Sequence, residues 1–231
     1  MPATKRAKSK DVPGKKRIVA RHRIREAIHG QILNGQSKPG TKLVQQQLAK
    51  QFGVSMGLIR EALLELQAWG LVDVHDNRGV YVCNWDANRI LETYEIREVL
   101  EGLAARRCCG RLSSKQLAEL KALAEDIFIA AKAEKGEEST RLEREFHGRI
   151  IQWSGSEIVG RLAANYQFLR KLIWVRSDPH GTRQGHLAIV SALRGNDPVH
   201  AEGVAREHVL VARRFIEKRI AESGFHPNWV L

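Results

Sequence analysis

Four side chains in the C-terminal half of the chain have the types and the spacing of metal ligands. Glu143 and His147 are four residues apart and therefore share one face of a predicted helix. His186 and His208 each lie eleven residues from Asp197, which sits in a Gly-Asn-Asp-Pro turn (197 − 186 and 208 − 197). Positions equidistant from the loop of an antiparallel helix pair lie side by side, so both imidazoles are expected to face one point. Three imidazoles and a carboxylate suit a borderline divalent ion, with zinc first and nickel, cobalt or manganese as alternatives.

These ligand candidates also have other interpretations. A Glu/His pair at this spacing is more often a solvated surface pair, so the metal site depends on the two later histidines. A bound ion could be purely structural, or it could activate water as in a metal-dependent hydrolase. The sequence places no further acid or base beside the ion, and we therefore expect no catalytic residues and no enzyme.

Residues 43–82 predict two short helices joined by a tight turn and followed by a hairpin. Apolar residues recur at helical spacing before Gly53, which ends the first helix. Ser55 is a suitable N-cap for the second helix, which Gly70 terminates. Alternating apolar and polar residues on either side of 77–79 predict a β-hairpin. We interpret the whole as a winged helix-turn-helix that binds double-stranded DNA. The apolar positions assigned to the first helix are Leu43, Val44, Leu48, Ala49 and Phe52.

The second helix of this motif is the candidate reading helix. Its first turns carry Ser55, Met56, Gly57 and Arg60, which would let it approach base edges in the major groove. Arg78 at the hairpin tip is placed to reach a minor groove or phosphates. A solvated surface Arg is the simpler interpretation of Arg60 alone, and the surrounding turn and wing favour DNA contact.

The elements that must position these residues form a mainly α protein. A helix from Lys15 to Leu33, with Ile18 and Ile24 among its inward residues, completes the DNA-binding part. From Asp86, which can cap a helix, the pattern changes to a period of 3.6 with no convincing strand up to Ala221. Short connections predict an all-helical antiparallel bundle of about six helices. The predicted divisions are a basic disordered tail at 1–14, the DNA-binding domain at 15–83, a linker at 84–88, the helical effector-binding and dimerisation domain at 89–221, and a C-terminal tail at 222–231.

Most of the positive charge lies at the N-terminus. The 231 residues carry a formal net charge of +12. Residues 1–25 contain ten Lys/Arg against one Asp and so supply +9 (10 − 1), which leaves +3 (12 − 9) for the rest. Such a tail either adds phosphate contacts or serves only as a solubilising terminus.

The sequence indicates a cytoplasmic protein without membrane contact. No apolar run approaches the roughly 20 residues of a membrane span, and the basic N-terminus lacks the apolar segment of a signal peptide. The three cysteines, Cys83, Cys108 and Cys109, form no framework of even number. We interpret them as reduced thiols packed in a core, although the vicinal pair could also sense oxidants or bind soft metals.

The N-terminal motif resembles the DNA-binding domain of the GntR family of bacterial transcription regulators over about Ile24 to Val82. The resemblance departs from the family pattern where an Arg usually follows the turn Ser, since Met56 stands there, and where a charged pair usually precedes it, since Gln45 and Gln46 stand there. It rests on Pro39-Gly40, Leu48-Ala49, Gly53-Val54-Ser55, Arg60-Glu61-Ala62-Leu63, Leu66, Gly70-Leu71-Val72 and Asn77-Arg78-Gly79. The DNA-contacting residues that it implies are Gln45, Gln46, Ser55, Met56, Gly57, Arg60, Arg78 and Gly79.

Residues from about Ile90 to Ile216 resemble the helical ligand-binding domain, called FCD, of the FadR branch of that family. In metal-binding members an Asp four residues before a His, that His and two later His hold the ion. Carried over to this chain, the set is Glu143, His147, His186 and His208, with Glu143 in place of the usual Asp and Gly185 where Glu commonly precedes the later His. The resemblance rests on Tyr94-Glu95-Ile96-Arg97, Leu100-Glu101, Phe146-His147, His186 to Ile189, Ala192-Leu193, Asp197 and Ala205 to His208.

The resemblance implies a homodimeric regulator, expected to be a repressor, that reads an inverted-repeat operator and senses a small carboxylate. A cation in the bundle would leave coordination positions for that carboxylate, and Arg97 could pair with it bidentately. Arg176 is a second candidate. Ordinary ion pairing with Glu95, Glu98 or Glu101, or with Asp178 for Arg176, is the alternative for both arginines.

Overall fold

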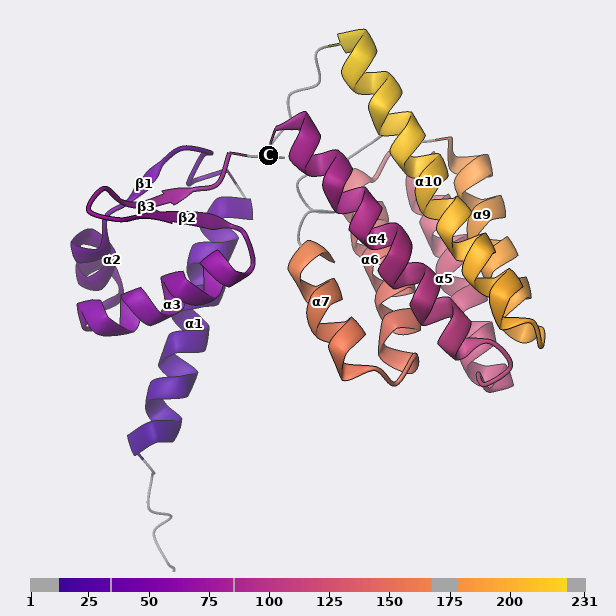
Figure 1. Cartoon of the computed structure of the whole chain (residues 1–231), viewed down its shortest axis with the longest axis horizontal. Helices are drawn as coiled ribbons and strands as arrows, with labels where there is room; N and C mark the ends of the chain where they lie inside the picture. Colours follow the sequence, from indigo (N-terminus) through magenta and orange to yellow (C-terminus); the bar gives the residue numbers. More distant parts are fainter. Residues whose placement is uncertain (1–12, 34, 85, 168–177, 224–231) are drawn as a thin grey trace, which may run out of the picture. The chain divides into compact units, whose positions relative to one another are not determined.

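The computed structural model describes residues 13–33, 35–84, 86–167 and 178–223 (Figure 1). The chain forms two compact units, the first ending at Cys83 and the second beginning at Asn84. Among the described residues, no helix is long and apolar enough to cross a membrane.

The first unit is a winged helix-turn-helix, as the sequence predicted. Its helices pack beside an antiparallel sheet with the strand order β1-β3-β2 (Figure 1). The sequence missed the outer strand, because a two-residue strand is too short to show a period. Leu43, predicted within the first helix, pairs instead with Val80 across the sheet and is buried. The elements are α1 (Pro13–Leu33), β1 (Lys42–Leu43), α2 (Gln45–Phe52), α3 (Met56–Ala68), β2 (Val72–His75) and β3 (Gly79–Val82).

The turn between α2 and α3 has the predicted local chemistry. Gly53 adopts a left-handed conformation with φ of 63° and ends α2. The Ser55 side chain then accepts a hydrogen bond from the backbone N–H of Leu58 at 3.3 Å and caps α3. These two residues set the angle at which α3 leaves the turn.

Helix α1 is held partly by charge rather than by the apolar contacts predicted for its N-terminal half. Ile18, expected to face inward, is 58% exposed. Beside it, Arg17 forms an ion pair with Glu61 of α3, and Arg21 Nε lies 2.7 Å from a carboxylate oxygen of Glu65. Ile24, Ile28 and Ile32, farther along α1, are buried.

The second unit is an antiparallel helical bundle, and no strand occurs among its described residues (Figure 1). Helix α10 packs along α4, while α5 packs against both α6 and α9. The helices begin two residues earlier and end two residues later than the predicted limits of 89 and 221. The described helices are α4 (Ala87–Cys108), α5 (Ser114–Lys132), α6 (Gly136–Trp153), α7 (Glu157–Gln167), α9 (Pro179–Arg194) and α10 (Pro198–Ser223).

The cysteines are buried free thiols, as the sequence predicted. Cys108 Sγ lies 3.3 Å from the carbonyl oxygen of Ile150, and burial raises the pKa of this thiol to about 11. A thiol with a raised pKa stays protonated at neutral pH and is a poor nucleophile and metal ligand. The geometry therefore favours the packing interpretation of Cys108 over a sensing one.

Capping side chains start several helices of the bundle. Asp86 caps α4 and Asp178 caps α9 through hydrogen bonds from backbone N–H groups. Ser113 forms a complete capping box with Gln116 at the start of α5. The loss of such a cap costs about 1 kcal/mol, mostly at the helix that it serves.

We therefore expect Ser113→Ala to destabilise α5 by about 1 kcal/mol, or roughly fivefold in local opening. Hydrogen exchange of the α5 amides in the full chain measures this opening directly. Ser114→Ala, one residue later and equally exposed, is the matched control, because Ser114 is the first helical residue and not the cap. Equal exchange in both variants would contradict the assignment of the cap.

Candidate functional site

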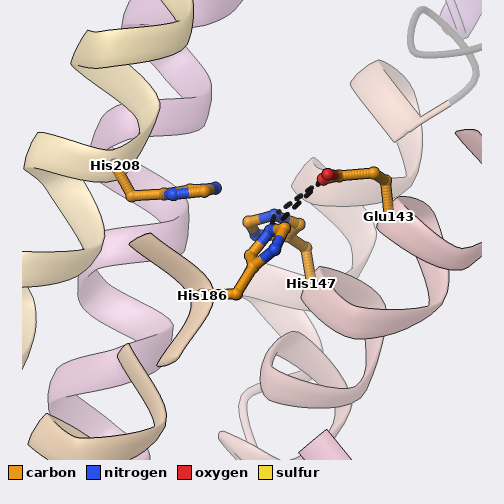
Figure 2. A group of neighbouring side chains, drawn as sticks. All are labelled: Glu143, His147, His186 and His208. Carbon is orange, nitrogen blue, oxygen red and sulfur yellow. Dashed lines mark hydrogen bonds and ion pairs between the residues drawn. The ribbon is translucent and has the colours of Figure 1, made fainter. Parts of the chain in front are cut away.

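The four predicted metal ligands come together inside the helical unit. Glu143 and His147 lie one turn apart on α6, His186 comes from α9 and His208 from α10. One ligand atom of each lies within 4.8 Å of all the others. Figure 2 shows the Glu143 carboxylate directed at the imidazoles of His147 and His186, with the His208 ring pointing toward them. The symmetry of the α9–α10 hairpin about its turn therefore correctly predicted this convergence.

Three of the donor atoms already have the spacing of ligands on one ion. His147 Nε2 lies 3.4 Å from His186 Nε2, and Glu143 Oε2 lies 3.5 and 3.4 Å from these two nitrogens. A tetrahedral ion with bonds of about 2.1 Å separates its ligands by about 3.4 Å, whereas neighbouring ligands of an octahedral ion are about 3.0 Å apart. The donor chemistry and the spacing of these three atoms thus fit a divalent metal ion.

The surroundings keep His208 in the form that binds metals. Desolvation, followed by the nearby His186 and His147, lowers the pKa of His208 well below 6.5, although the carboxylates of Glu143 and Glu101 oppose this shift. Its ring stacks on that of His147 with centroids 5.2 Å apart. His208 is therefore a neutral imidazole at neutral pH, and a neutral imidazole is the ligand form.

Glu101 on α4 contacts His147 at Nδ1, the ring nitrogen that does not face the other donors, a role that the sequence did not reveal. One carboxylate oxygen, Oε2, lies 2.7 Å from His147 Nδ1, and the other accepts a hydrogen bond from Arg97 Nε at 3.0 Å. This carboxylate favours the proton on His147 Nδ1, which leaves Nε2 as the ligand atom. Arg97 and Glu101 stand four residues apart on one helix, and this spacing was a readable signal.

The donor cluster opens onto a cavity of about 640 Å³, which Glu143 and His208 both line. Arg97, the predicted effector contact, lines the same cavity. Its guanidinium carbon lies 4.4 Å from the Tyr94 ring centroid, and the side chain is 2% exposed. Arg97 thus makes the ordinary ion pair considered for it and also faces the cavity. Arg176, the second predicted contact, lies outside the described residues.

Gly185 makes room for His208. A Cβ built on Gly185 would lie 2.5 Å from His208 Nδ1, so any side chain at this position would displace the ring. His180, the spare ligand considered from the sequence, lies instead against the Phe128 ring with centroids 5.0 Å apart. The ligand cluster of described residues does not include it.

The predicted reading surface lies at the start of α3 in the first unit. Ser55, Met56, Gly57 and Arg60 are all exposed, and Met56 is 46% exposed. The first turn of α3 contains no acidic residue. An exposed helix N-terminus without acidic side chains favours the approach of phosphates and base edges.

The neighbouring elements add further candidate contacts. Gln45 and Gln46 open α2, with Gln46 the more exposed. In the wing, Arg78 is exposed at the tip between β2 and β3, and Gly79 adopts a φ of 108° that favours glycine. The eight predicted contact residues therefore belong to the helix-turn-helix and the wing, and all lie on the first unit.

Comparison with known families covers both units. Residues 20–82 match the model of the bacterial regulatory proteins of the gntR family, and residues 92–211 match the FCD domain. The chain is 30% identical over 164 residues to the Nta operon transcriptional regulator of Aminobacter aminovorans, covering 68% of this chain and 75% of that protein.

Two further comparisons agree with this family. The chain is 26% identical over 176 residues to the HTH-type transcriptional repressor RspR of Escherichia coli, covering 74% of this chain and 77% of the relative. Its fold is similar to that of the E. coli McbR/YncC structure, with a TM-score of 0.66, 22% identity and coverage of 87% and 98% of the two chains. The matched families are families of transcription regulators and not of enzymes, which removes the hydrolase alternative. The chain is a GntR-family transcription regulator with a DNA-binding winged helix-turn-helix and a C-terminal FCD domain.

Proposed function

We propose that this regulator is a homodimeric repressor whose helical unit binds a divalent metal ion and a small-molecule carboxylate that changes its affinity for an inverted-repeat operator. The observation that carries the proposal is the convergence of Glu143, His147, His186 and His208 at a cavity that Arg97 also lines. The repressor role is supported by the similarity to a relative named as a repressor.

The DNA contacts are assigned to the first turns of α3, to the start of α2 and to the wing. On α3 the acidic Glu61 and Glu65 pair with arginines of α1, so their charge is neutralised. Arg60 is exposed and has no ion pair with a described residue. This difference supports Arg60 as the α3 side chain that contacts bases or phosphates.

The metal is assigned to the four converging donors, and zinc is favoured by the set of three imidazoles and one carboxylate. A bound ion that takes a further ligand beyond these four would supply a Lewis-acidic position for a carboxylate. Glu143 and His208 line the cavity, so an effector bound there can reach these two metal-binding side chains. This access from the cavity favours a sensing role over a purely structural ion.

The energy required for regulation is modest. A tenfold change in operator affinity takes about 1.4 kcal/mol of differential effector binding between two arrangements of the protein. A carboxylate that meets both Arg97 and the ion can supply this amount, since hydrogen bonds to charged groups contribute roughly 1.5–3 kcal/mol each.

Dimer formation is assigned to an apolar face of the helical unit. On α4, Ile96, Val99 and Leu103 are 57%, 53% and 37% exposed at helical spacing. Helix α7, which packs against α4, exposes Ile158 and Leu162. A self-complementary patch of this kind fits the twofold interface that an inverted repeat requires.

Arg60→Ala should weaken binding to the operator by roughly 10-fold to 100-fold, since a specific side-chain contact to a base contributes about 1–3 kcal/mol. Mobility shift at low salt, with palindromic fragments from the region upstream of the gene, tests both the proposal and the residue. Arg194→Ala, an exposed arginine of the helical unit, serves as the control. If no fragment shifts with the unaltered protein, the operator proposal fails. If both variants bind alike, the Arg60 contact fails.

His147→Ala should remove the bound metal, and Glu101→Gln should weaken metal binding by roughly 10-fold to 100-fold because Glu101 orients His147. Elemental analysis and competition with a chelating dye measure the two effects. Glu145→Gln is the matched control, since Glu145 lies on α6 but pairs with Arg141 and Arg149. Equal metal content in the unaltered protein and in His147→Ala would eliminate the site.

Val99→Glu should convert the dimer into a folded monomer, because it places a charge in the middle of the proposed interface. Sedimentation velocity measures the change in mass. Ile129→Glu provides the control, since Ile129 is 62% exposed on α5, which packs against α6 and α9. A Val99→Glu protein that remains dimeric would show that the interface lies elsewhere.

A further inference from the structure

The cavity beside the metal ligands has both polar and apolar lining. Glu143, His208 and Arg97 are among its polar residues. Beyond His208, α10 presents Val211, Ala212, Phe215 and Ile216 to the same cavity, and α4 adds Tyr94. The eight residue steps from His208 to Ile216 span about 12 Å along a helix. The apolar wall is therefore as long as an extended hydrocarbon chain or an arylalkyl group.

The volume of the cavity also exceeds what a very small acid needs. Pockets of roughly 300–1,000 Å³ hold drug-sized molecules, and this cavity measures about 640 Å³. A two- to four-carbon acid placed at Arg97 would leave the apolar wall in contact with water. Burial of that wall by a ligand is favourable in proportion to the apolar area covered.

The charges along the cavity limit the ligand to one carboxylate. Arg97 is the only Lys or Arg among the described residues that line it. Asp178 and Glu207 line it as well and would repel a second carboxylate. This distribution disfavours di- and tricarboxylic acids.

We propose that the effector is a monocarboxylic acid with an extended apolar body, of the size of a medium-chain fatty acid or an arylalkanoic acid. Its carboxylate binds to Arg97 and to the metal ion, and its apolar body lies along Val211, Ala212 and Phe215. The inference rests on the proposed function, since it assumes that a carboxylate binds at the metal and Arg97.

Calorimetric titration of the zinc-loaded full chain with acetate, hexanoate, octanoate and octanedioate tests this inference. Each methylene buried against the apolar wall should tighten binding about fourfold. Octanoate has six more methylenes than acetate, so it should bind roughly 4,000-fold more tightly if all six are buried. Octanedioate has the same length as octanoate and should bind more weakly, because its second carboxylate meets the apolar wall and the acidic residues.

Variants locate the apolar body. Val211→Asp should weaken octanoate binding by about tenfold or more, since it puts a charge beside the chain, and should weaken acetate binding much less. Val211 is 54% exposed, so the substitution should not prevent folding. Val199→Asp, at a valine that is 66% exposed on the same helix but does not line the cavity, is the matched control.

The possible outcomes separate this inference from the proposed function. If acetate and octanoate bind the zinc-loaded protein equally, the inference of an apolar body on the effector is wrong, while the proposal of carboxylate sensing stands. If Val211→Asp and Val199→Asp weaken octanoate alike, the chain binds elsewhere and the inference is also wrong. If neither acid binds although zinc is retained, carboxylate sensing itself fails.

Discussion

A buried ion pair centred on Glu101 supports the interior of the helical unit. Glu101 is 5% exposed, and an ionised carboxylate in such surroundings is costly unless it is paired and hydrogen-bonded. Arg97 supplies a hydrogen bond and His147 a close charge contact, from two different helices. Because Arg97 faces the cavity and His147 faces the other donors, a single carboxylate fixes both the predicted effector contact and a predicted metal ligand. The packing of α4 against α6 is thus tied to the geometry of the candidate site.

Ion pairs also hold elements together in the first unit. Glu61 and Glu65 of α3 are neutralised by arginines of α1, and these pairs hold the N-terminal half of α1 where its apolar residues do not. The N-terminal turn of α3 is left without acidic side chains, so the positive end of its dipole is not offset. The same helix therefore presents an acidic face to α1 and an exposed N-terminal part, with Arg60, that is free of acidic side chains in its first turn.

Local patterns in the sequence predicted most of this architecture. Helix periods, caps such as Ser55 and Asp86, and the equal distance of His186 and His208 from a turn all depend on neighbouring residues, and each was confirmed by the geometry. Features that depend on distant contacts were missed, namely the strand at Leu43 and the exposure of Ile18. The contact of Glu101 with His147 and the space that Gly185 leaves for His208 also depend on distant contacts and were missed. No spacing rule reveals which residue of one helix faces a given residue of another.

Thermodynamic linkage couples the binding of the metal ion and of the effector at such a site. If the effector carboxylate binds where Arg97 and the metal ligands meet, the ion and the effector share one network through Glu101. Binding free energies are reciprocal, so any factor by which the ion raises effector affinity is also the factor by which the effector raises retention of the ion. The same relation joins effector and operator. A regulator built in this way responds more strongly to the effector in its metal-loaded form. Without the ion, Arg97 is the one Lys or Arg among the described residues that line the cavity, and Glu101 already shares its charge.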